Sequence, residues 1–75
     1  MQGRHAFVAA NLRCDAVNAA DYWVVRVLGV SVARDRNLAT AIELATGGII
    51  GSTQAKRIAE RIIRLSSTES GSTKP

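Results

Sequence analysis

Apolar side chains recur at three- and four-residue steps between residues 53 and 65, near the end of the chain. The stripe consists of Ala55, Ile58, Ala59, Ile62 and Leu65. Such spacing places all five on one side of a helix, with charged residues mainly on the other. Ser52 precedes the segment, and its hydroxyl can cap the free N–H groups of the first turn. Glu60 and Arg64 are ordered correctly for an ion pair along the helix surface.

A second apolar stripe at helical spacing occupies residues 16–28 and permits two interpretations. It consists of Ala16, Ala19, Ala20, Trp23, Val24, Val27 and Leu28. Asp15 before it and Gly29 after it are typical of the start and the end of a helix. The β-branched and aromatic residues of 22–28, however, favour a strand. We expect a helix, because Asp15 and Gly29 enclose a run of helical length; the alternative is an α+β fold with a strand at about 22–28.

Two further helices are expected from the same kind of spacing. Residues 35–46 hold apolar side chains at helical steps, and Gly47-Gly48 follows as a stop. Residues 4–12 are expected to form a short first helix. The predicted fold is therefore all-α, a small bundle of three or four short helices in one domain over residues 1–65. Residues 66–75 contain no apolar side chain and are expected to be a disordered Ser/Thr-rich tail.

Composition limits the size and surroundings of this domain. The chain has 75 residues, 47% apolar and 21% charged, which suits one small globular unit. Asp21 and Arg26 interrupt the most apolar region, so we expect no membrane partner and a cytoplasmic protein. Because a domain of this size buries only about 60% of its unfolded surface, we also expect a homodimer.

Few residues are available for catalysis or metal binding. His5 is the one histidine and Cys14 the one cysteine, and neither has a recognisable partner in the sequence. Metal sites need several such ligands, so no metal or cofactor is expected, and the chain is predicted not to be an enzyme. The glycine-rich run 46–53 lacks the lysine spacing of a phosphate-binding loop and is interpreted as a connection between helices.

Positive charge is the strongest functional indication. The net charge is +4, and residues 52–65 hold four basic side chains against Glu60. With residues 35–46, this segment is similar in outline to a helix-turn-helix, and residues 16–28 with 32–46 form a second possible unit. We expect a small regulatory protein that occupies double-stranded DNA. The candidate nucleic-acid-binding residues are Ser52, Thr53, Gln54, Lys56, Arg57, Arg61 and Arg64.

Two other interpretations of the basic segment stay open. The chain could be a small modulator or inhibitor of another protein, of the kind that mobile genetic elements encode, binding an acidic protein surface. Tyr22, Trp23 and Ile63 are the candidate interface residues for that function. Alternatively, the basic side chains only keep the outer face of a helix solvated.

Overall fold

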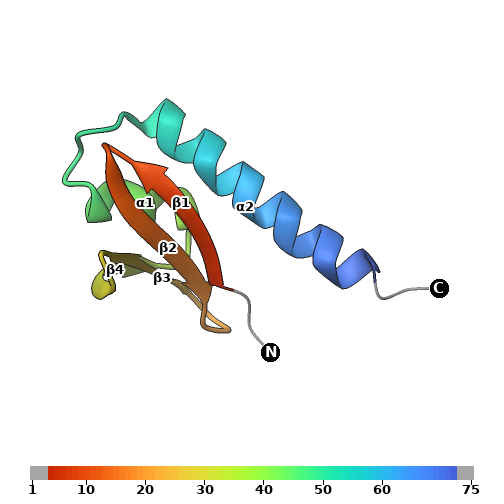
Figure 1. Ribbon diagram of the computed structural model, residues 1–75. Helices are drawn as coiled ribbons and strands as arrows, with labels where there is room; N and C mark the ends of the chain where they lie inside the picture. The colour runs from red at the N-terminus through yellow and green to blue at the C-terminus, as the bar shows by residue number, and fades with distance from the viewer. Residues whose placement is uncertain (1–3, 73–75) are drawn as a thin grey trace.

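The computed structural model describes residues 4–72 and shows an α+β fold. Its elements are β1 (Arg4–Ala9), β2 (Leu12–Asn18), β3 (Trp23–Val27), β4 (Val30–Asp35), α1 (Leu38–Ala45) and α2 (Ser52–Ser72). The strands form one antiparallel sheet in the order β1-β2-β3-β4, and the two helices follow (Figure 1). The prediction of an all-α bundle is therefore wrong.

Tight turns explain why the first half of the chain forms hairpins. Ala10 and Asn11 have φ angles of 53° and 63°, and Leu28 and Gly29 have 53° and 84°. Positive φ at both central residues is the property of the two-residue turns whose twist matches that of paired strands. The predicted helix over residues 4–12 is therefore replaced by β1 and the turn that leads into β2.

The segment 16–28 was the ambiguous one, and the strand alternative matches β3. The burial of Val25 distinguishes the strand from the helix, because Val25 does not belong to the helical stripe and yet is fully buried. It lies opposite Ala16 on β2 and Ala33 on β4. Asn18 stops the preceding strand, because its side-chain oxygen accepts a hydrogen bond from the N–H of Ala20 at 3.0 Å. Asp15 lies within β2 and does not cap a helix.

The two C-terminal helices occupy the segments in which periodicity predicted them. In α1, Asn37 caps the first turn by accepting a hydrogen bond from the N–H of Thr40 at 3.1 Å. Gly47 and Gly48 end that helix with φ angles of 66° and 81°. Residues 66–72, assigned to the tail by composition, continue α2, and residues 73–75 lie outside the described residues.

The hydrophobic core lies between one face of the sheet and the two helices. Strand residues such as Cys14, Ala16 and Val25 point into it. The helices contribute Leu38, Ala41, Ile42, Ala55, Ala59 and Ile62. A long α2, about 31 Å at 1.5 Å per residue, gives the molecule its largest dimension of 42 Å (Figure 1).

Neither expected helix-turn-helix unit is present in residues 4–72. The first would need a tight turn, but α1 and α2 are separated by residues 46–51, in which Gly47 and Gly48 have positive φ angles. The second would need a helix over 16–28, where the chain forms strands. Both helices bury their inner faces against a sheet, so the bundle that would support a recognition helix is missing. Neither α1 nor α2 has the length and apolar character that a membrane span requires.

Candidate nucleic-acid interface

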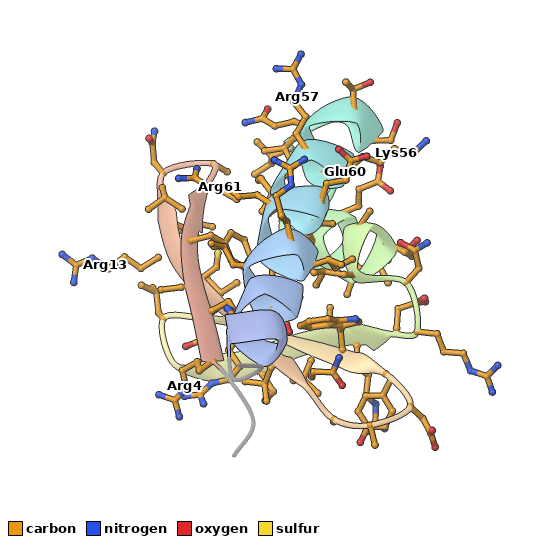
Figure 2. All side chains as sticks on the ribbon, turned by 90° about the vertical axis from the view of Figure 1, so that its right-hand side faces the viewer. Arg4, Arg13, Lys56, Arg57, Glu60 and Arg61 are labelled. Atoms are coloured by element: carbon orange, nitrogen blue, oxygen red, sulfur yellow. The ribbon has the colours of Figure 1, made fainter. Side chains whose placement is uncertain are left out.

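The exposed side of α2 carries a row of three arginines. Because Ala55, Ala59 and Ile62 are buried, the opposite side of the helix faces solvent. Arg57, Arg61 and Arg64 are exposed and follow one another at four- and three-residue steps. Residues at these steps are neighbours on a helix surface. We call these three residues the arginine row; Figure 2 shows Arg57 and Arg61 projecting away from the helix.

No carboxylate among the side chains described for residues 4–66 forms an ion pair with the arginine row. Among the side chains described for residues 4–66, the one ion pair joins Arg26 and Asp15. The predicted pair between Glu60 and Arg64 is not formed within that range. Positive charge on α2 is therefore directed to solvent, where it is available to an anionic partner.

The other residues predicted to bind nucleic acid lie on either side of this row. Ser52, Thr53 and Gln54 are exposed in the first turn of α2. Thr53, Gln54 and Arg57 line one shallow cleft of about 610 Å³ beside Gly51. Lys56 lies on the other flank of the helix, where it borders a cleft shared with α1. Thr53 and Gln54 thus share a surface with Arg57, whereas Lys56 lies on the flank toward α1.

Arg4 is a cation that the sequence analysis missed. It begins β1 and lines a groove of about 530 Å³ together with Arg61 of α2. Residues 4–12 were expected to be a helix, so the proximity of Arg4 to residue 61 was not foreseen. Only the packing of α2 beside β1 brings the two residues to the same groove.

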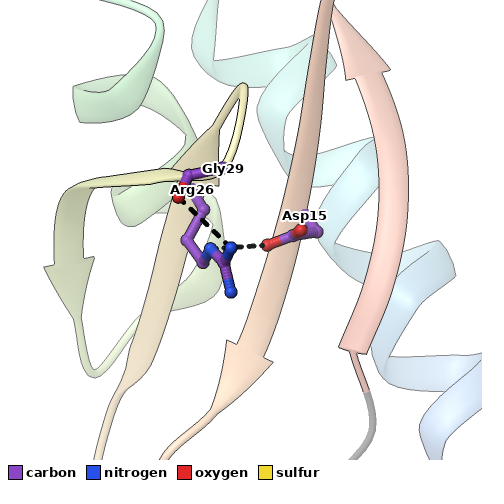
Figure 3. Close-up of polar contacts among 3 residues, drawn as sticks. All are labelled: Asp15, Arg26 and Gly29. Atoms are coloured by element: carbon purple, nitrogen blue, oxygen red, sulfur yellow. Dashed lines mark hydrogen bonds and ion pairs between the residues drawn. The ribbon is translucent and has the colours of Figure 1, made fainter.

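The uncovered face of the sheet carries more arginines. By strand register, Arg4, Arg13, Arg26 and Arg34 point to this face. Arg26 is held in place: its Nε lies 3.6 Å from Asp15, and its Nη2 donates to the carbonyl of Gly29 at 3.2 Å (Figure 3). The guanidinium of Arg34 lies 5.6 Å from the centre of the Tyr22 ring. The alternation of apolar and polar residues over Leu12–Ala16 is the sequence signal that could have identified this face.

The three residues predicted for a protein interface do not form one surface. Trp23 is 9% exposed and belongs to the core. Ile63 is 46% exposed and borders a cleft of about 290 Å³ that reaches the edge of Trp23. Tyr22 is half-buried and lies under Arg34, away from that cleft.

His5 and Cys14 lie in an environment that is not typical of catalysis. His5 is half-buried on β1 and lies opposite Ala16. Cys14 is buried, and burial raises the pKa of its thiol above the ordinary value of 9.0, while the nearby Asp15 carboxylate adds to the rise. A thiol with a raised pKa is a poor nucleophile at neutral pH. No group of three or more potential metal ligands occurs in the part of the chain that the structure describes.

We compared the chain with known proteins at three levels. No protein-family model, no curated protein and no solved structure matches it.

Proposed function

We propose that the protein binds duplex DNA through the arginine row of α2 and acts by occupying the DNA rather than by catalysis. The observation that supports this function is the exposure of Arg57, Arg61 and Arg64 in one row without a carboxylate partner among residues 4–66. Phosphate groups are the densest source of negative charge that such a row can meet, and arginine binds them through two parallel hydrogen bonds.

The length of the row suits a DNA strand. Residues 57 and 64 are seven positions apart, which is about 10 Å along a helix. Phosphates of one strand advance about 3.4 Å along the duplex axis per nucleotide and lie farther apart through space, so the row can reach more than one of them. Ser52, Thr53 and Gln54 lie at the start of the same helix, where they can donate hydrogen bonds to the DNA backbone or to base edges. This arrangement requires no helix-turn-helix.

Salt dependence of binding tests the proposal. A labelled DNA duplex is titrated by fluorescence anisotropy at several salt concentrations. If the three arginines and Lys56 each contact one phosphate, the slope of log K against log salt should be about −3.6. Affinity should then fall about 150-fold between roughly 50 mM and 200 mM salt. In the double variant Arg57→Ala/Arg61→Ala the slope should be about −1.8 and the loss about 12-fold.

A charge-matched variant separates specific contacts from net charge. Arg13→Ala/Arg34→Ala removes the same two charges from the uncovered face of the sheet, where α2 does not lie. Its slope should stay close to that of the unmodified protein. If both double variants lower the slope equally, or if neither does, α2 is not the DNA-binding surface. Light scattering of the same samples measures whether the expected homodimer forms.

A further inference from the structure

The free edge of β1 has no bulge, no proline and no lysine, which are three of the features that protect the edge of a sheet. Strand order places β1 and β4 at the two edges. The β3–β4 pairing contains an irregularity at Val25/Arg26, whereas β1 pairs with β2 without interruption from Arg4 to Ala9. Residues 4–9 contain no proline and no lysine. Bulges, prolines and lysines are among the devices that prevent an edge from pairing with another chain.

Half of the backbone N–H and C=O groups of β1 point away from β2 and are available for pairing. No strand or turn within residues 4–72 hydrogen-bonds to that side of β1. The groove of about 530 Å³ runs along this edge, with residues 4–8 on one side and α2 on the other. An unpaired strand beside a helix is the geometry in which a sheet accepts an additional strand from a partner.

The groove also has a defined chemical character. Its α2 side presents Ile58, Ile62 and Leu65, and Leu65 is 50% exposed despite being aliphatic. Arg4 and Arg61 border it, and none of the described residues that line it carries a carboxylate. On the uncovered side of the sheet, Val8 of β1 is 65% exposed and lies opposite Arg13. The groove therefore combines an apolar wall with positive charge.

We propose that the groove between β1 and α2 binds an acidic peptide segment of a partner protein in extended conformation, which adds to the sheet as a fifth strand. The positive charge of Arg4 and Arg61 favours an acidic segment. The unpaired edge of β1 favours an extended one, because only an extended backbone can hydrogen-bond along a strand. Successive side chains of a strand point to opposite faces. Apolar residues at alternate positions then contact Ile58 and Leu65, while the acidic residues between them face Arg4 and Arg13.

A designed peptide tests this binding mode directly. The probe is a fluorescein-labelled hexapeptide of alternating valine and glutamate with blocked ends, titrated with the full chain. We expect saturable binding with one peptide per chain. A peptide of alternating valine and lysine should not bind. Chemical shift changes in a ¹⁵N-labelled protein should concentrate in residues 4–9 and 58–65.

Backbone methylation distinguishes strand addition from simple charge attraction. In a strand, the amides of alternate residues point to opposite edges, so all valine amides share one edge and all glutamate amides share the other. Two further probes therefore carry N-methyl groups either on the valines or on the glutamates. One of the two should lose binding by more than about tenfold, because its edge can no longer donate hydrogen bonds to β1. The other should bind like the parent. Equal binding by both would overturn the proposal.

A matched pair of variants locates the peptide. Leu65→Gln should weaken peptide binding by about fivefold or more, because an aliphatic contact is lost. Leu44→Gln makes the same change at a 59% exposed position on α1, away from the groove, and should change affinity less than about twofold. Equal effects of the two variants would also overturn the proposal.

This inference does not depend on DNA binding. Neither glutamine variant alters charge, so the salt slope for DNA should be unchanged in both. Failure of the peptide test therefore leaves the DNA proposal intact, and a flat salt slope for DNA leaves the peptide groove intact.

Discussion

Truncation of Ile42 is a severe test of the packing of the core, because Ile42 and Val25 are its largest fully buried side chains. Ile42 lies in α1 and is fully buried where the helices meet the sheet. Replacement by alanine generally costs about 2–5 kcal/mol, depending on how far the surroundings collapse into the cavity. Here the neighbouring core contains Ala16, Ala41, Ala55 and Ala59, which have no side-chain freedom with which to fill a cavity. We therefore expect a loss in the upper half of that range, about 3–5 kcal/mol.

A loss of this size is large for a domain of this length. A stability of roughly 0.05–0.15 kcal/mol per residue gives about 4–11 kcal/mol for the whole chain. Urea unfolding can be followed by the fluorescence of Trp23, which is the one tryptophan and is 9% exposed. Ile42→Ala should lower the urea midpoint strongly with an unchanged slope, and Ile42→Val should cost about 0.5–1.5 kcal/mol.

The control is Ile49→Ala, because Ile49 is 73% exposed in the loop between the helices. Its free energy of unfolding should change by less than about 0.5 kcal/mol. Similar losses at residues 42 and 49 would refute the assignment of Ile42 to the centre of the core.

Three smaller predictions concern a turn, a helix cap and the buried thiol. Leu28→Asn should stabilise the protein by about 1 kcal/mol, measured as a higher Tm, because asparagine tolerates the positive φ at this position before Gly29 better than leucine does. A fall in Tm would contradict this account of the turn. Asn37→Ala should cost about 1 kcal/mol in urea unfolding, since the N–H of Thr40 loses its acceptor, whereas Asn37→Asp should keep most of the stability. Equal losses would argue against the cap. Burial raises the pKa of the Cys14 thiol, so the folded protein holds this proton more tightly than the unfolded chain does. The resulting contribution to the free energy of unfolding is fully present below the ordinary pKa of 9.0 and is lost as the pH rises through the folded-state pKa. Between about pH 8 and pH 10 the free energy of unfolding should therefore fall more in the unmodified protein than in Cys14→Ala. Parallel profiles of unfolding free energy against pH for the two proteins would contradict this prediction.

Local pattern was a sound guide where a helix has one buried side and strong end signals. In α2, Ala55, Ala59 and Ile62 are buried as their spacing predicted, and Gly47-Gly48 ends α1 as expected. The basic side chains of α2 could be found in the same way, because a helix that buries one side must expose the other. Leu65 is the exception: it belongs to the stripe, yet it is half exposed beside the free edge of β1.

Local pattern failed over residues 4–35, because a strand is stabilised by partners distant in sequence. As a helix, residues 16–28 would present an apolar stripe; as strands, they bury Val25. The local sequence signals do not distinguish these two conformations. Pairing of Val25 with Ala16 and Ala33 chooses the strand. Strand pairing also places Arg13 and Arg34 on the same uncovered face, whereas helices over the same residues would not bring these two side chains to one face.

The order of amino acids was thus sufficient to establish α1, α2, the basic outer side of α2 and the scarcity of catalytic groups. Tertiary structure alone formed the sheet, gave it a buried and an uncovered face, and left one edge of β1 without a partner strand among residues 4–72. It also brought Arg4 to the groove that Arg61 lines, across more than fifty residues of chain. The physical reason is that a helix satisfies its backbone hydrogen bonds within one segment, whereas each strand depends on another segment to accept and donate them.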